Sequence, residues 1–324
     1  MKHVCLFAHF DKDDKVDDYV LRYLEQIKEL GFWVVFISTS RLSSEWINKL
    51  RRVCGDIILR ENKGLDFASW SAGLAKHGTA FDGRLLLAND SVYGPIGSLR
   101  SALDRLTSAS ADFYGMVESI EVAPHLQSWF LLFEPWVVRD ETFKEIVAQH
   151  FDTMPKKQII VSGEVGLSRR LMAAGFHYEA LYRSNLPGLN SLRHAVNPML
   201  LFWREVLVEH GVPFLKIELL RDNPLGIEGT ATILEPISGT EPVLSDIIKS
   251  HLARTRGAQP LQRQFLSRFR YALIRKRYRL KLENRRIEAL CNGILLETMT
   301  ASLVAWRALR PYVLWRNRTD VGSK

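Results

Sequence analysis

Short apolar runs alternate with helical spacings over the first third of the chain. The apolar runs have the length and β-branched content of buried strands, and they cover residues 4–10, 32–37, 56–59 and 85–88. Between the first two runs, apolar residues recur every three or four positions up to Gly31, and residues 45–53 form a second candidate helix. Strands that alternate with helices predict an α/β fold: a Rossmann-like, mostly parallel sheet with helices on both faces.

Two of the loops that follow these runs hold unusual chemistry. Ligands of parallel sheets bind at the carboxyl ends of the strands. The loop after the third run contains Asn62-Lys63-Gly64 and then Asp66, and the fourth run leads into Asn89-Asp90-Ser91. Either loop alone also fits ordinary turn or capping chemistry. In this order, with a helix rich in small residues between them, they are typical of a nucleotide-sugar site.

Positive charge is concentrated at the C-terminal end. Residues 254–324 carry 17 basic and 4 acidic side chains, whereas residues 1–253 carry 27 and 32. Turn-forming residues cluster between Asp222 and Pro242. We therefore expect a domain over 1–228, a linker over 229–253 and a basic, amphipathic helical tail over 254–324.

The predicted tail helix has an apolar stripe surrounded by basic residues. This pattern does not determine which surface the helix binds. Such a helix can pack on the domain, lie on an anionic membrane surface or bind nucleic acid, and we rank nucleic acid last. Residues 287–306 are apolar, but Glu288 and Glu297 lie within them. A carboxylate in the middle of a bilayer costs roughly 3 kcal/mol, so we do not expect this segment to span a membrane.

Several other classes of protein are disfavoured. The three cysteines, Cys5, Cys54 and Cys291, are far apart, which argues against a disulfide framework or a zinc site. The sequence has no Walker loop, no Gly-x-Ser-x-Gly and no His-Glu-x-x-His. We expect a cytoplasmic protein that is peripheral to the inner face of the plasma membrane.

Five blocks of sequence suggest a family. They are Glu61–Phe67, Asn89–Pro95, His125–Phe130, Ser162–Ser168 and Phe214–Pro224. In their residues and in their order along the chain, these blocks resemble the rhamnan synthesis F family of polysaccharide glycosyltransferases. The resemblance covers about residues 1–225 and leaves the tail outside. It implies the class A (GT-A) fold of nucleotide-diphospho-sugar transferases.

The resemblance also implies catalytic roles. Asp90 is the expected ligand of Mg²⁺ or Mn²⁺, although Asn89-Asp90-Ser91 offers one carboxylate where the Asp-x-Asp element offers two. Weak metal affinity, or help from another residue, would follow. Glu164 is the expected catalytic base, with Asp66 as the second candidate for base or ribose contact. Alternatively, Glu164 could simply favour a helix N-terminus.

Binding roles follow in the same way. The residues expected to contact the nucleotide sugar are Asn62, Lys63, Gly64, Asn89 and Ser91. Those expected to contact the sugar or the acceptor are His125, Gln127, Ser128 and Trp129. For Trp129 a place in the core competes with this role.

The function that the resemblance implies is inverting transfer of a deoxyhexose. The donor would be dTDP-rhamnose, and the acceptor a lipid-linked cell-surface polysaccharide such as O-antigen or rhamnan, with the tail on the anionic membrane. A sugar nucleotidyltransferase is the first alternative. Such enzymes normally have a glycine-rich basic loop after the first strand, whereas this chain has Asp11-Lys12-Asp13-Asp14 there. A catalytically degenerate domain that acts as a membrane-associated scaffold is the second.

Overall fold

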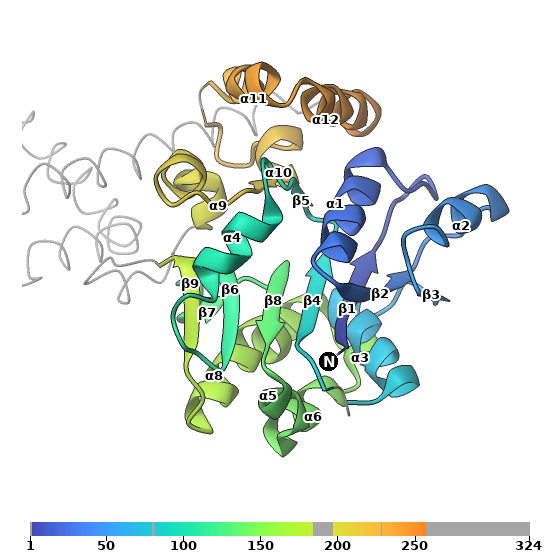
Figure 1. The fold of residues 1–324 in the computed structure, drawn as a ribbon, viewed down its shortest axis with the longest axis vertical. Coiled ribbons are helices and arrows are strands. Elements are labelled where there is room, and N and C mark those ends of the chain that lie inside the picture. Colours follow the sequence, from blue (N-terminus) through green and yellow to red (C-terminus); the bar gives the residue numbers. More distant parts are fainter. Residues whose placement is uncertain (1, 80–81, 184–196, 228, 257–324) are drawn as a thin grey trace, which may run out of the picture.

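The computed structural model describes residues 2–79, 82–183, 197–227 and 229–256 (Figure 1). Its main sheet has eight strands in the order β3-β2-β1-β4-β8-β6-β7, with β9 also paired to β6. The parallel strands of one half are β1 (His3–His9), β2 (Phe32–Ser38), β3 (Asp56–Leu59) and β4 (Leu85–Asn89). The four strands predicted from apolar runs are confirmed.

The other half of the sheet is mixed. Its strands are β6 (Phe113–Ser119), β7 (His125–Leu126), β8 (Phe130–Phe133) and β9 (Tyr178–Tyr182). Strand β8 is antiparallel to both β4 and β6, whereas β9 is parallel to β6. Beside the main sheet, β5 (Val92–Tyr93) pairs antiparallel with β10 (Leu215–Lys216). The predicted α/β fold with a mostly parallel sheet and helices on both faces is confirmed.

Helices lie on both faces of the sheet (Figure 1), and each face has its own core. In β1, Cys5 and Phe7 belong to one core, whereas Leu6 and Ala8 belong to the other. This period of two is what a strand that is buried on both faces requires. The helices that contribute to the first core are α1 (Asp18–Glu29), α2 (Ser44–Leu50), α4 (Leu99–Leu106), α9 (Pro198–Leu201), η4 (Glu205–Glu209), α10 (Ile217–Arg221), α11 (Leu234–Thr240) and α12 (Pro242–Thr255).

The second core lies under a different set of helices. They include α3 (Leu65–His77), α5 (Pro135–Arg139), α6 (Glu141–Val147) and α8 (Gly166–Ala173). This second core also takes residues from η1 (Phe151–Thr153) and α7 (Lys156–Ile159). The other described helical segments are η2 (Ile160–Val165) and η5 (Thr230–Thr232). None of the described helices combines the length with the apolar composition needed to cross a bilayer.

Residues 229–253 differ from the predicted linker. They hold η5, α11 and most of α12, and α12 buries Leu244, Ile248 and Leu252 in the first core. Several of the turn-forming residues that suggested a linker instead belong to helices: Pro236 and Gly239 lie within α11, and Gly229 caps η5. Pro242 is the first residue of α12, a position where its missing N–H costs nothing. Residues 257–324, which hold most of the predicted tail, lie outside the described part of the chain.

Docking of α12 can be tested by truncating one side chain. Ile248 is fully buried, whereas Val243 on the same helix is 68% exposed. We expect Ile248→Ala to lower the free energy of unfolding by about 2–4 kcal/mol, because it leaves a cavity in the core. Val243→Ala should change it by less than about 0.5 kcal/mol. Urea denaturation of both variants checks this, and equal small effects would mean that α12 does not pack on the domain.

Candidate active site

Parallel pairing brings the ends of three strands to one edge of the sheet. His9 pairs in register with Ser38 of β2, and Ala8 pairs with Asn89 of β4. His9, Ser38 and Asn89 are each the last residue of their strand and are buried. Asp90 therefore leaves β4 at the carboxyl edge, where ligands of parallel sheets bind.

Asp90 is held by the segment that follows β1. Its Oδ2 accepts a hydrogen bond of 2.9 Å from the backbone N–H of Phe10. Its backbone carbonyl accepts one of 3.1 Å from the Tyr19 hydroxyl. The Nε2 of His9 lies 3.9 Å from the same Oδ2. The carboxylate thus has a fixed place, although its side chain is still 16% exposed.

Burial and a neighbouring carboxylate change the protonation of Asp90. Burial raises the pKa of Asp90 to about 8, and the negative charges of Asp66 and then Asp11 act in the same direction. The hydrogen bond from Phe10 acts in the opposite direction. At neutral pH this carboxyl group therefore largely keeps its proton, and it would release that proton to water if a cation bound beside it.

Asn89 connects Asp90 to Asp66. Its Nδ2 donates to Asp66 Oδ2 over 2.8 Å, while its Oδ1 accepts from both the N–H and the hydroxyl of Ser91 at 3.0 and 2.7 Å. Burial raises the pKa of Asp66 to about 6, against the Asn89 hydrogen bond. The nearby charge of Lys216 lowers this pKa and that of Glu164 raises it. Asp66, Asn89, Asp90 and Ser91, all predicted from sequence, therefore lie together.

Glu164 lies close enough to Asp66 for its charge to affect the pKa of that residue. Its Oε1 accepts hydrogen bonds of 2.9 and 3.0 Å from the N–H and the hydroxyl of Ser128. The residue lies in η2, a π-helical segment between α7 and α8, so it is inside a helical run and not at its N-terminus. The helix-dipole alternative is thus not supported. π-helical segments of this kind are frequent at functional sites.

Lys216 is a site residue to which the sequence analysis gave no role. Strand β10 pairs it with Val92, two residues after Asp90, and the next amide, of Ile217, donates to the Ser91 carbonyl over 3.1 Å. Within the described residues, its ammonium makes neither a hydrogen bond nor an ion pair. A signal was present in the sequence: Lys216 is a single cation in the apolar stretch Phe214–Leu220.

His9 is the second site residue that the sequence analysis missed. Its Nδ1 lies 2.9 Å from Ser38 Oγ, and burial lowers its pKa to about 4. The imidazole is therefore neutral at physiological pH. Its position at the end of the first predicted strand was the available signal.

The first predicted loop does not bring its three residues to this group. Asn62 and Lys63 are exposed, and the Lys63 ammonium lies 2.7 Å from Glu61 on the surface. Gly64 has φ of +74°, as expected, but a Cβ there would lie 2.7 Å from the backbone nitrogen of Asp152. In this structure Gly64 thus permits close packing of the loop against η1, and we find no contact that ties the three residues to Asp66 or Asp90.

Three of the predicted sugar contacts are core residues. His125, Gln127 and Trp129 are buried, and the Trp129 indole is only 1% exposed. Its N–H donates to Gln127 Oε1 over 2.8 Å, and Gln127 in turn donates to Asn197 Oδ1. A stacking role for Trp129 is therefore wrong, because its ring faces cannot reach a sugar. Only Ser128 of this block reaches the site, through Glu164.

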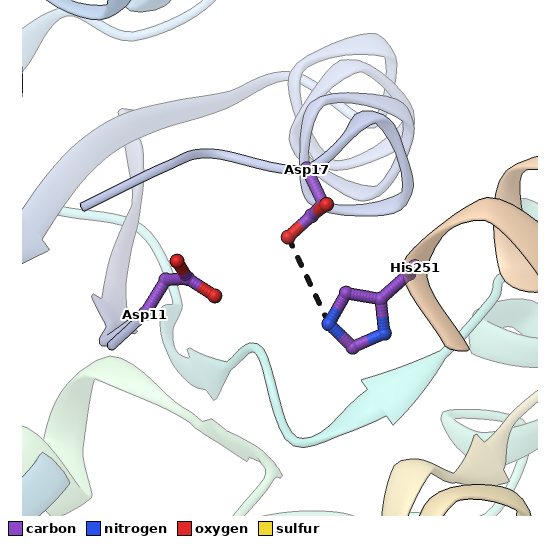
Figure 2. Close-up of side chains that lie close together, drawn as sticks. All are labelled: Asp11, Asp17 and His251. Carbon is purple, nitrogen blue, oxygen red and sulfur yellow. Dashed lines mark ion pairs between the residues drawn. The ribbon is translucent and has the colours of Figure 1, made fainter. Parts of the chain in front are cut away.

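A separate acidic group lies beside the site. Figure 2 shows Asp11, Asp17 and His251, whose ligand atoms lie within 4.8 Å of one another. Arg254, not drawn there, donates to Asp11 over 2.7 Å and also to Asp17. A metal ion would have to displace this guanidinium, so the group fits a metal poorly. Asp66 and Asp90 fit better, because a divalent cation would relieve the repulsion that raises the pKa of Asp90.

The sequence profile of the family described as Rhamnan synthesis protein F matches residues 34–300. The chain belongs to the rhamnan synthesis protein F family. This family match continues past residue 228, through α12 and into residues 257–300, so it corrects the expectation that the resemblance ends near residue 225.

Individual relatives of this rhamnan synthesis protein F chain are more distant. The virulence protein VirA of Vibrio anguillarum is 27% identical over 78% of this chain and 91% of its own length. Among solved structures, TarS 1-349 from S. aureus has a TM-score of 0.38 at 11% identity, covering 86% of this chain and 92% of that one. The glycosyltransferase GlyE from Streptococcus pneumoniae has 0.34 at 12%, covering 80% and 66%.

The raised pKa values predict an unusual dependence of stability on pH. The carboxyl pKa values of about 8 for Asp90 and 6 for Asp66 exceed the ordinary value near 3.9 in an unfolded chain. The native state therefore holds more protons between about pH 4 and pH 8, and the free energy of unfolding falls as pH rises through this window. We expect Asp90→Asn, which can still accept from Phe10, to be more stable than the wild type at pH 8 by on the order of 1–3 kcal/mol.

Urea denaturation at pH 4.5 and pH 8 measures this difference, which should nearly vanish at the lower pH. Asp246→Asn is a suitable control, because that carboxylate is on the surface of α12. Lower stability of Asp90→Asn at pH 8 would show that the Asp90 carboxylate stabilises the fold.

Proposed function

We propose that this protein is a glycosyltransferase that moves a sugar from a nucleotide-diphospho-sugar donor onto a polysaccharide acceptor. The observation that carries the proposal is the meeting of Asp66, Asp90 and Glu164 with Lys216 at the carboxyl edge of the parallel strands. Membership of the rhamnan synthesis protein F family supports it. Carboxylates on three different elements suit a reaction that needs both a cation site and a base.

Departure of the nucleoside diphosphate sets the first chemical demand. A divalent cation, when bound, supplies charge neutralisation for the leaving diphosphate. Asp90, with help from Asp66, would hold it. Lys216 would add a second positive charge against a phosphate oxygen, since its ammonium has no partner within the described residues. The Phe10 amide and the Tyr19 hydroxyl keep Asp90 in place during this step.

Activation of the acceptor hydroxyl sets the second demand. We propose that the Glu164 carboxylate takes the proton of the attacking hydroxyl as the sugar is transferred with inversion. Two hydrogen bonds from Ser128 orient this carboxylate before the acceptor arrives. Asp66 is the second candidate, because a carboxyl pKa of about 6 is close to that of an effective base at neutral pH.

For the substrates, we propose dTDP-rhamnose as donor and a lipid-linked cell-surface glycan as acceptor. The description of the family as a rhamnan synthesis protein supports the choice of rhamnose. We also propose that the basic tail beyond Arg256, residues 257–324, brings the enzyme to an anionic membrane surface, where each Lys or Arg near the lipid contributes about 1 kcal/mol. Sedimentation with vesicles that do or do not contain anionic lipid tests this last part, and equal binding to both would contradict it.

Nucleotide binding is the direct test of the proposed activity. We expect dTDP with Mn²⁺ to raise the melting temperature of the full chain, because a ligand at 100 times its dissociation constant adds about 2.7 kcal/mol to stability. UDP and GDP should give smaller shifts. Thermal unfolding in the presence of each nucleotide measures this, and Asp90→Asn should lose the metal-dependent part. No shift with any nucleotide would contradict the proposal.

Substitution of the proposed base separates chemistry from binding. Glu164→Gln keeps an oxygen that can accept from Ser128, so the local structure should persist. We expect its turnover to fall by about 10²- to 10⁴-fold, with donor affinity within about twofold of the wild type. Steady-state kinetics and calorimetry on the same preparation give the two numbers. Normal turnover in Glu164→Gln with a large loss in Asp66→Asn would move the role of base to Asp66.

A further inference from the structure

Helix α12, the last described helix, is hydrogen-bonded to the loop that follows β1. Arg254 of α12 donates to Asp11 Oδ2 over 2.7 Å, to Asp13 Oδ2 over 2.5 Å and to Asp17. Its side chain is 19% exposed. Burial alone would raise the pKa of Asp11, but the hydrogen bonds from Arg254 hold it below its ordinary value. One guanidinium thus compensates three carboxylates that would otherwise repel one another.

The residues on either side of this loop also donate hydrogen bonds to Asp90. Phe10, whose amide donates to the Asp90 carboxylate, directly precedes Asp11. Tyr19, whose hydroxyl donates to the Asp90 carbonyl, comes two residues after Asp17. Between Phe10 and Tyr19 lie all three carboxylates that Arg254 contacts. The Asp11 backbone is also fixed on its other side, because it exchanges hydrogen bonds of 2.8 and 3.0 Å with the Ser40 hydroxyl.

A second residue of α12 reaches the other side of Asp90. His251 lies one turn before Arg254, and its Nδ1 is 2.6 Å from the hydroxyl of Tyr93, three residues after Asp90. The His251 ring also packs edge to face against Tyr19 and Tyr93. Helix α12 therefore contacts both the loop after β1, through Arg254, and the segment just after Asp90, through His251.

We infer that Arg254 is a positioning residue for the candidate active site: by fixing the loop between β1 and α1, it holds Asp90 in place. The inference rests on the proposed function only for what Asp90 does there. It gives α12 a role at the site, although most of this helix falls in the predicted linker and Arg254 itself is the first residue of the predicted tail. Loss of Arg254 should free Phe10 and Tyr19 to move away from Asp90, and donor binding should weaken although Arg254 touches no substrate.

Amide hydrogen exchange in the full chain tests the positioning directly. In Arg254→Met, we expect the Phe10 amide to exchange at least about tenfold faster than in the wild type, since its bond to Asp90 opens more often. The amide of Val35, in the middle of β2, should keep its rate. Arg254→Lys should fall between the two, because an ammonium keeps the charge but lacks the planar fork. Lys249→Met, which removes an exposed charge from the same helix, is the matched control and should match the wild type.

Nucleotide affinity is the second readout. Calorimetry with dTDP and Mg²⁺ should show about tenfold weaker binding for Arg254→Met, the size of effect typical when the support of a metal ligand is removed. Tyr19→Phe removes only the hydroxyl bond to Asp90 and keeps the ring contacts, so it should also weaken binding. If Arg254→Met does not fold, Arg254→Lys and Tyr19→Phe decide by the same two measurements.

Three results would overturn the inference. They are an unchanged exchange rate of Phe10, an equal acceleration of Phe10 and Val35, and faster exchange of Phe10 with unchanged nucleotide affinity. If the wild type binds no nucleotide, the proposed function fails, whereas the exchange rates still decide whether Arg254 fixes Asp90.

Discussion

Parallel pairing of β1 with both β2 and β4 is the constraint on which the candidate site depends. The register of these pairs puts His9, Ser38 and Asn89 at one edge of the sheet. The residues that follow β1 and β4, Phe10 and Asp90, therefore meet there. Because β1 is buried on both faces, a slip by one residue would exchange its two sets of core side chains. The packing of the core therefore also fixes the position of Asp90.

The site concentrates negative charge where water is scarce. Asp66 and Asp90 are largely removed from solvent, so each is costly to ionise without a cation nearby. The chain offsets part of this cost with an amide from Phe10, an amide from Asn89 and the charge of Lys216. The negative charge that remains uncompensated is what a divalent cation, bound as we propose, would neutralise. A site of this kind trades stability for binding.

The sequence was sufficient for what depends on local pattern. Apolar periodicity predicted β1 to β4. The family resemblance selected Asp66, Asn89, Asp90, Ser91 and Glu164, which lie in one region of the structure, and the roles it gave them stay predictions. The sequence was not sufficient where distant segments meet. Arg254 joins Asp11 across 243 positions, and Lys216 enters through the short β10 strand, so neither has a local signature. Composition alone left Trp129 between a sugar contact and the core, and its 1% exposure places it in the core. Pro242 suggested a linker but begins α12.

The end of α12 fixes the point from which the rest of the chain departs. Arg256, the last described residue, donates to the Leu220 carbonyl over 2.8 Å, two residues after Arg254 contacts the loop at the site. Leu220 belongs to α10, so the end of α12 is bonded to two segments that are far from it in the sequence, the loop after β1 and α10. A change in the position of α12 would therefore reach both of these segments at once.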